Sequence, residues 1–242
     1  MMFAMLTFVV SIAAGAIAAV AGFGVGSMLT PLLATAVGTR TAVAAVAIPH
    51  VVATALRFWM LRRRIDRRVF LSFGLASAAG GLAGALLHTH ASNHALAIVF
   101  GCLLLFVGVS ELTGFMKRVR PGRTAAWMAG AASGLFGGLV GNQGGIRSAA
   151  LLGFNTDKAA FVATATAVAL VVDAARMPVY LVTDAAALGR LWPLIAVATV
   201  GVCAGTLAGA RILFHVAERR YRPIVAILLL ALGAWMLTRG HA

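Results

Sequence analysis

The stretch "AGFGVGSMLTPLL", residues 21–33, interrupts a chain that is otherwise rich in Ala, Val and Leu. Gly22, Gly24 and Gly26 stand at alternate positions, which weakens a helix, and Pro31 follows them. We therefore predict a helix break within the first apolar segment, and we expect Pro31 to interrupt the segment that follows. The consequence of such a break for the backbone depends on whether water or lipid surrounds the helix.

The composition indicates an integral membrane protein. The 242 residues are 62% hydrophobic and 11% charged, whereas a soluble domain is about half apolar and about a quarter charged. Apolar runs of about twenty residues, enough to cross a bilayer core, recur along nearly the whole chain. The first run has no basic residues before it, so we interpret it as a mature membrane segment and not as a signal peptide.

The formal net charge of +14 is concentrated in short clusters between apolar runs. These clusters are "RRRIDRR" (62–68), "KRVRPGR" (117–123) and "ERRYR" (218–222). This placement is typical of cytoplasmic loops in a polytopic protein, because positive residues resist translocation. It argues against binding to nucleic acid and predicts contact with anionic lipid headgroups.

A second glycine-rich break, "LVGNQGGIRSAALL" (139–152), indicates an internal repeat. A shift of 119 positions (141 minus 22) carries Gly22 onto Gly141 and Arg57 onto Arg176. We interpret the chain as two copies of one unit.

The first copy is an N-terminal transmembrane repeat at 1–116, and the second is a C-terminal transmembrane repeat at 124–242. In each, a broken segment precedes three long helices, so the predicted fold is an all-α polytopic membrane protein. The expected segments are 3–38, 41–61, 69–88 and 94–114, then 125–155, 157–182, 190–213 and 222–238.

The charge pattern predicts that the two repeats are inverted. All three basic clusters reach the cytoplasm only if each broken segment crosses the membrane an even number of times, either as a re-entrant hairpin or as a V-shaped pair of full passes. Each copy then crosses an odd number of times, and the second copy is inserted upside down. Inverted repeats are typical of secondary transporters.

The two breaks are candidate parts of a substrate site. Lipid cannot satisfy the backbone N–H groups that a break releases, so a break must be buried in protein or line a polar cavity. Half-helices that start near Ser27 and Ile146 would aim electropositive N-termini at an anion. The candidate substrate-binding residues here are Gly24, Gly26, Ser27, Asn142, Gln143 and Gly144. Packing between small residues is the alternative.

Charged residues inside the apolar runs extend this hypothesis to Arg57, Arg147 and Arg176. Arg147, immediately after the second break, is the strongest candidate anion ligand unless it pairs with Asp173. Asp173 and Arg176 share one helix face and would form a structural ion pair. Arg57 would either bind substrate or extend its side chain to the headgroups.

His50 lies in the middle of a predicted helix, and we interpret it either as a coupling residue that relays protons, together with Asp173, or as a packing histidine. "HTHASNH" (88–94) is interpreted as a solvated loop and not as a metal site. No nucleophile–base pair stands at an obvious spacing. We therefore expect no enzyme activity, no catalytic residue and no cofactor.

At the two glycine stretches the sequence resembles the sulfite exporter TauE/SafE family of membrane transporters. The family motif ends in Pro-Leu near the start of each half: "GFGVGSMLTPLL" matches it, whereas "GNQGGIRSAALL" has Ala150 in place of the proline. The resemblance covers essentially the whole chain. It implies export of a small oxyanion such as sulfite or an organosulfonate across the bacterial inner membrane.

The resulting hypothesis is a multi-pass secondary transporter that exports a small anion by alternating access. An anion channel whose filter is formed by the broken helices is the alternative. The sequence leaves open the substrate, the driving ion and whether the protein forms a homodimer.

Overall fold

The apolar runs form helices in the computed structural model, which describes all residues except 116–122, 152–153, 155–157, 213–217 and 240–242. No strand occurs among the residues that it describes. Six helices in this part of the chain are long and apolar enough to cross a membrane: Met2–Ala21, Thr39–Arg64, Arg67–His90, Asn93–Thr113, Ala159–Thr183 and Trp192–Arg211. The prediction of an all-helical membrane protein is confirmed.

The first half of the chain forms helices that are joined by short turns. They are α1 (Met2–Ala21), α2 (Val25–Val37), α3 (Thr39–Leu61), the 3-10 turn η1 (Arg62–Arg64), α4 (Arg67–His90) and α5 (Asn93–Thr113). The carboxylate of Asp66 caps α4 and the hydroxyl of Ser92 caps α5, each by accepting hydrogen bonds from backbone N–H groups of the first turn. The expected helices 41–61, 69–88 and 94–114 correspond to α3, α4 and α5.

The second half repeats this order. Its helices are α7 (Arg123–Val140), α8 (Gly144–Leu151), α9 (Lys158–Thr183), α10 (Ala185–Arg190), α11 (Trp192–Ile212) and α12 (Glu218–Arg239). The expected helices 157–182, 190–213 and 222–238 correspond to α9, α11 and α12. The short helix α10 lies between the expected helices 157–182 and 190–213, where the sequence predicts no helix.

Both glycine stretches separate two helices through the same backbone conformation. Gly22 and Gly141 are left-handed, with φ of 79° and 73°, and their N–H groups donate to the carbonyls of Ala18 and Gly137. Such left-handed C-caps favour glycine because it lacks a Cβ atom. These four residues match under the shift of 119 positions, so the two breaks share one local backbone conformation.

Two details at the breaks differ from expectation. The following helices begin at Val25 and Gly144, two residues before the starts expected near Ser27 and Ile146. Pro31 does not interrupt the segment after the first break, because α2 continues through it to Val37. A proline only removes the bond to the carbonyl four residues earlier, and surrounding packing can hold the helix in place.

Small residues let α4 pack against α7, and α11 against α1, at close range. A Cβ atom added at Gly84 of α4 would collide with the carbonyl of Leu135, and one at Gly134 of α7 with that of Ser77. On the other side of the molecule, a Cβ at Gly205 of α11 would collide with the carbonyl of Ile12. Small-xxx-small contacts of this kind drive helix association within lipid, where apolar burial contributes little.

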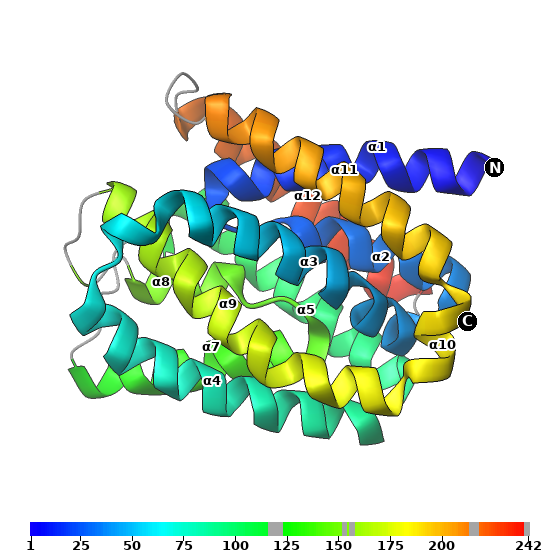
Figure 1. The fold of residues 1–242 in the computed structure, drawn as a ribbon, viewed down its shortest axis with the longest axis horizontal. Coiled ribbons are helices and arrows are strands. Elements are labelled where there is room, and N and C mark those ends of the chain that lie inside the picture. Colours follow the sequence, from blue (N-terminus) through cyan, green and yellow to red (C-terminus); the bar gives the residue numbers. More distant parts are fainter. Residues whose placement is uncertain (116–122, 152–153, 155–157, 213–217, 240–242) are drawn as a thin grey trace.

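Corresponding helices of the two halves run in opposite directions (Figure 1). In that view α3 runs from right to left and α9 from left to right, and α4 and α11 are likewise opposed. The start of α4, which lies within the basic cluster 62–68, is found with the start of α7 and the end of α11 at the left end, which we call the basic end.

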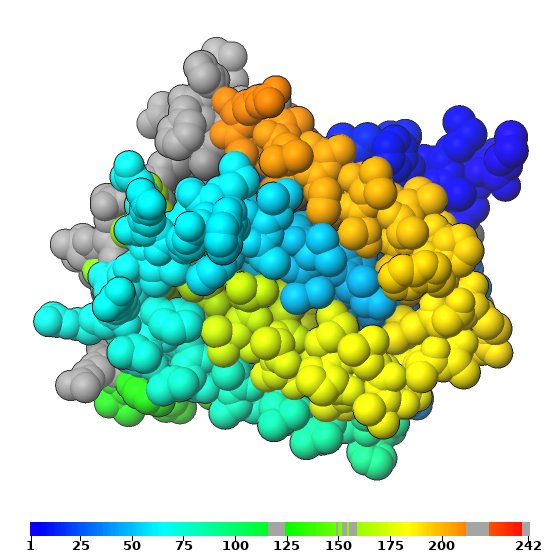
Figure 2. Space-filling model, viewed as in Figure 1, coloured from blue at the N-terminus to red at the C-terminus, as the bar shows by residue number. Residues whose placement is uncertain are grey.

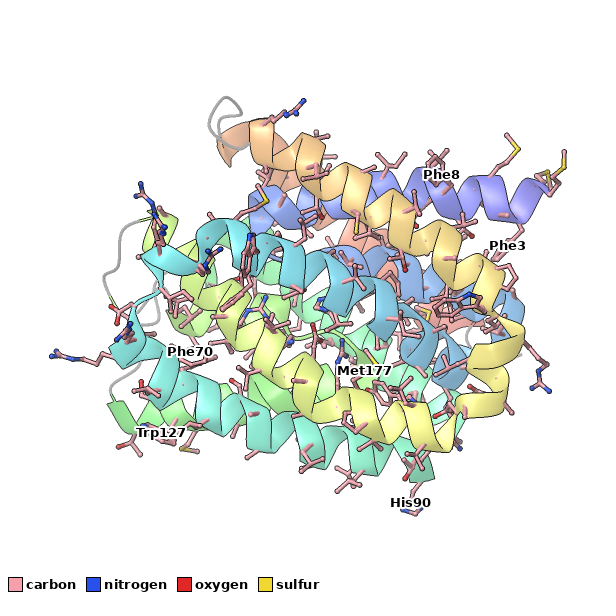
Figure 3. The ribbon with its side chains drawn as sticks, in the orientation of Figure 1. Phe3, Phe8, Phe70, His90, Trp127 and Met177 are labelled. Atoms are coloured by element: carbon pink, nitrogen blue, oxygen red, sulfur yellow. The ribbon has the colours of Figure 1, made fainter. Side chains whose placement is uncertain are left out.

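Many large apolar side chains lie on the surface, and several charged side chains lie in the interior, as expected for a protein surrounded by lipid. Side chains of α3, α4, α9 and α11 cover the face shown in Figure 2. Large apolar side chains such as Phe8 and Trp127 are exposed, and they project from the helices in Figure 3. By contrast, Arg57, Arg147 and Asp173 are buried.

Candidate functional site

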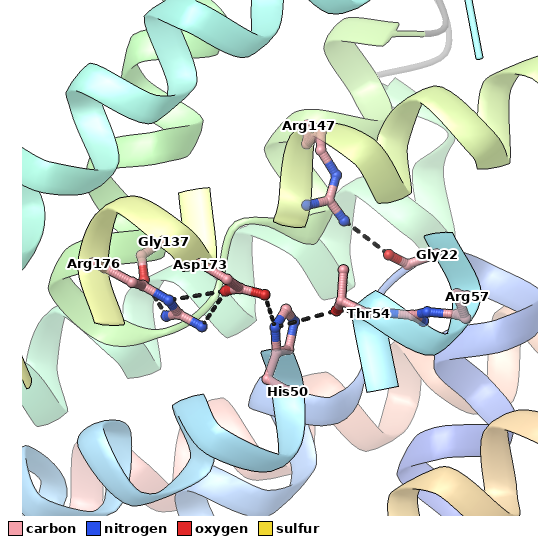
Figure 4. A network of polar contacts seen from close by, with 8 residues as sticks. All are labelled: Gly22, His50, Thr54, Arg57, Gly137, Arg147, Asp173 and Arg176. Atoms are coloured by element: carbon pink, nitrogen blue, oxygen red, sulfur yellow. Dashed lines mark hydrogen bonds and ion pairs between the residues drawn. The ribbon is translucent and has the colours of Figure 1, made fainter. Parts of the chain in front are cut away.

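The buried charges lie where the second half of α3, the middle of α9 and the two breaks approach one another (Figure 4). The exposed fractions are 5% for Arg57, 2% for Arg147, 1% for Arg176 and 0% for Asp173. Charges are almost never this buried unless they are paired or functional. Their hydrogen-bond partners therefore decide which of them is structural.

Arg176 is held by a complete set of contacts on its own helix and on α7. Its Nε and Nη2 atoms lie 3.0 Å and 2.7 Å from Oδ1 of Asp173. Its Nη1 donates to the carbonyl of Gly137 at 2.5 Å. The Asp173–Arg176 ion pair expected from the spacing is present within α9, and the bond from Arg176 to Gly137 ties α9 to the last turn of α7.

Asp173 also joins α9 to α3. Its Oδ2 atom lies 2.7 Å from Nδ1 of His50, whose ring is 3.5 Å from Oγ1 of Thr54. Nη2 of Arg57 donates to that hydroxyl at 3.2 Å. His50 is thus hydrogen-bonded to Asp173 at the middle of α3, a contact that fits both a coupling residue and a hydrogen-bonded packing histidine.

Arg57 is buried inside the bundle and does not extend to the headgroups. Apart from the bond to Thr54, its guanidinium is short of partners: Nε and Nη1 find no acceptor among the described residues. Asp173 is the only acidic side chain in that part of the chain that interacts with it electrostatically. Within the described structure, Arg57 therefore carries a buried positive charge without a counter-ion of its own.

Arg147 of α8 is in the same situation. Its Nη2 donates to the carbonyl of Gly22 at 2.9 Å, which links the second break to the first. Nε and Nη1 have no acceptor in the described structure. Arg147 also lies close enough to Arg57 for the two charges to repel each other. It does not pair with Asp173, which was the alternative that the sequence left open.

The two breaks are in direct contact. A Cβ atom at Gly26 would collide with the carbonyl of Gly141, and one at Gly144 would collide with Phe23. The absence of a side chain at Gly26 and at Gly144 thus lets the two breaks approach each other this closely. Gly24 serves a different need, since its φ of 142° is one that other residues rarely adopt.

Polar side chains at the breaks are buried as well. Ser27, Asn142 and Gln143 are 1%, 5% and 3% exposed. The amide nitrogens of Asn142 and Gln143, and the amide oxygen of Gln143, have no partner among the residues described. These groups can still donate to or accept from a bound molecule.

Three side chains from neighbouring helices cap the end of α7. The last carbonyls of a helix have no partner within it, and here those of Gly137, Gly138 and Leu139 accept from Arg176, Tyr180 and His88 respectively. This cap satisfies the backbone where the second break interrupts the helix.

The cap also corrects the interpretation of "HTHASNH" as a solvated loop. His88 belongs to α4 and is fully buried, with its Nδ1 atom 2.8 Å from the carbonyl of Leu139. His90 ends α4 and His94 lies in the first turn of α5, so only Ala91 and Ser92 separate the two helices. Ser92 of this short turn caps the start of α5, and Asp66 caps the start of α4 at the opposite end of that helix.

Sequence reasoning missed the contacts of Thr54 and Tyr180 with the arginines, and the contact of His88 with the end of α7. A signal existed for two of them. Thr54 precedes Arg57 by the same three positions that separate Asp173 from Arg176, and Tyr180 follows Arg176 by four positions on one helix face. Nothing in the sequence indicates that His88 reaches the second break, because that contact joins residues 51 positions apart.

Comparison with protein families gives a match to the family model described as "Sulfite exporter TauE/SafE", over residues 7–236. Comparison with curated proteins and with solved structures gives no match.

Proposed function

Because the chain belongs to the sulfite exporter TauE/SafE family of membrane transporters, we propose that it carries a small oxyanion, such as sulfite or an organosulfonate, bound between Arg57 and Arg147. The observation that carries this proposal is the set of four buried guanidinium nitrogens, Nε and Nη1 of each arginine, without an acceptor in the described residues.

The energetics of burial support an anion as the missing partner. A buried charge is strongly unfavourable unless it is paired and hydrogen-bonded. An oxyanion supplies both a compensating charge and several acceptor oxygens, and guanidinium groups match such anions with parallel N–H donors. The amide groups of Asn142 and Gln143 are available to complete the site. The starts of α2 and α8 would add partial positive charge.

We propose alternating access between two inverted repeats as the mechanism. Three observations support the repeat: the shared left-handed glycines at the breaks, the opposed directions of α3 and α9, and the corresponding glycine contacts of α4 and α11. The closed contact between the breaks fits an occluded state. Rocking of one repeat against the other would then expose the arginines to each side in turn.

The same arrangement suggests an orientation and a coupling group. We propose that the basic end faces the cytoplasm of a bacterium, against anionic headgroups of the inner membrane. His50 and Asp173 connect α3 to α9 next to the arginines, so a proton taken up by this pair would alter the charge beside the substrate.

Transport assays in proteoliposomes test the function. The purified protein should take up radiolabelled sulfite with saturation, and external unlabelled sulfite should drive counterflow of the label. Counterflow identifies a carrier, whereas saturable flux without counterflow would point to the channel. Absence of flux for sulfite, sulfonates and other small oxyanions under either direction of a pH gradient would contradict the proposal.

Arg147→Ala tests the site. The variant should lose at least about 90% of the flux, because it removes one of the two cationic ligands. Arg190→Ala is the matched control, since Arg190 is exposed in α10. Both variants should elute as the wild-type protein does in size-exclusion chromatography. Wild-type flux in Arg147→Ala would remove Arg147 from the site.

A further inference from the structure

We propose that Thr54 determines the charge of the anion that the site accepts, so that the protein prefers a doubly charged oxyanion to a singly charged one of the same shape. This inference rests on the proposed function and specifies its substrate class.

Arg57 and Arg176 stand at corresponding positions but have different partners. The shift of 119 positions that relates the breaks carries Arg57 onto Arg176, and it carries Thr54 onto Asp173. Each arginine contacts the residue three positions before it: Arg176 reaches the carboxylate of Asp173, and Arg57 reaches the hydroxyl of Thr54. The same local geometry therefore contains an acid in one half and a neutral group in the other.

This difference leaves two positive charges in the site without a counter-ion among the described residues. Asp173 is already engaged by Arg176 on one oxygen and by His50 on the other. Among the described residues, it is also the only acidic side chain that interacts electrostatically with Arg57 or with Arg147. With His50 neutral, one carboxylate thus faces three guanidiniums, which leaves a net charge of two.

The charge of the substrate should match that excess. In a poorly hydrated interior, charges interact more strongly than in water, and an uncompensated cation is unfavourable. A dianion compensates Arg57 and Arg147 together, whereas a monoanion of equal shape leaves one of them uncompensated. A dianion loses more hydration free energy than a monoanion when it enters the site. The site therefore prefers the dianion only if the attraction to the second arginine exceeds this additional loss.

Sulfite and chlorate form a suitable pair of probes. Both are pyramidal anions with three oxygens and the same number of electrons, and they differ in charge. At alkaline pH sulfite is doubly deprotonated and an imidazole is neutral. Competition against labelled sulfite in wild-type proteoliposomes should give at least about tenfold weaker inhibition by chlorate than by unlabelled sulfite, which corresponds to ~1.4 kcal/mol.

Thr54→Asp should shift this selectivity. The new carboxylate would pair with Arg57 as Asp173 pairs with Arg176, and it would reduce the excess charge to one. We expect the ratio of sulfite to chlorate affinity to fall by at least about tenfold, measured by the binding of each anion to the purified protein. Thr54→Asn, similar in size to the aspartate but neutral, is the matched control and should retain the wild-type ratio.

Arg57→Gln provides a second route if Thr54→Asp does not fold. It also removes one positive charge from the site, and it should lower the same ratio. An unchanged ratio in either folded variant, or equal affinities for sulfite and chlorate in the wild-type protein, would overturn the inference. These outcomes are distinct from failure of the proposed function, in which the wild-type protein would transport no oxyanion at all.

Discussion

Arg57 and Arg176 occupy positions related by the internal repeat, yet their environments assign them different tasks. Arg176 forms an ion pair with Asp173 and caps the carbonyl of Gly137. Arg57 has a hydroxyl where Arg176 has a carboxylate, and two of its nitrogens find no acceptor in the described part of the chain. We infer that Arg176 stabilises the fold and that Arg57 serves the substrate.

Alanine at the two positions should therefore affect stability differently. Arg176→Ala removes the guanidinium that pairs with the buried Asp173 carboxylate and should lower the free energy of unfolding by about 3 kcal/mol. Arg57→Ala removes an uncompensated charge and should leave that free energy unchanged or raise it. Unfolding by SDS in mixed micelles, followed by circular dichroism, measures both. Equal losses in the two variants would contradict this division of roles.

At the scale of helices, the glycines of α4 and α11 set the separation between neighbours. Gly84 and Gly205 occupy corresponding places in the two halves, and each lies against a backbone carbonyl of the helix that it packs on, that of Leu135 and that of Ile12. Since a carbonyl that is bonded within its own helix cannot move away alone, these contacts exclude any side chain.

Gly84→Ala and Gly205→Ala should each destabilise the protein by about 1–3 kcal/mol, because an added methyl group forces the two helices apart. Gly189→Ala in α10 is the control: a Cβ atom there would meet no described atom within 4 Å. Melting temperatures in detergent compare the three variants. A loss in Gly189→Ala as large as in the other two would show that packing at the carbonyls is not the cause.

At the scale of the whole molecule, the inverted repeats that we propose require that equivalent turns lie on opposite sides of the membrane. The start of α4 and the start of α7 share the basic end, whereas the end of α4 and the helix α10 lie at the other end. Chemical labelling of the two ends can therefore determine the orientation of the protein in the membrane.

Single cysteines provide the measurement, in a background where Cys102 and Cys203 are replaced by alanine. Cysteines at His90 and Gly189 should react with an impermeant maleimide added outside right-side-out vesicles, and cysteines at Arg63 and Thr124 should not. All four positions are exposed. The pattern should reverse in inside-out vesicles. Labelling of the Gly189 and Arg63 positions from the same side would contradict the inverted arrangement.

Much of the fold follows from local pattern. The length and apolar character of α3, α4, α5, α9 and α11 are readable from the sequence, because the bilayer requires each crossing segment to satisfy its own backbone hydrogen bonds. The helix ends at the glycine stretches are equally local, since they depend on left-handed conformations that glycine adopts readily. Pro31 misled because its effect depends on the packing around α2.

Hydropathy, helix length and glycine conformation are local properties, so the amino-acid sequence alone indicates a helical membrane protein with two glycine-rich interruptions and a few charges in its apolar runs. The ion pair of Asp173 and Arg176 is local as well, but the other contacts of the buried charges depend on the tertiary fold. Arg147 reaches Gly22, His50 reaches Asp173 and His88 reaches Leu139 across more than 50 positions of sequence. Whether a buried arginine is structural or free to bind an anion depends on which acceptors the folded chain brings to it, and spacing along one helix cannot specify them.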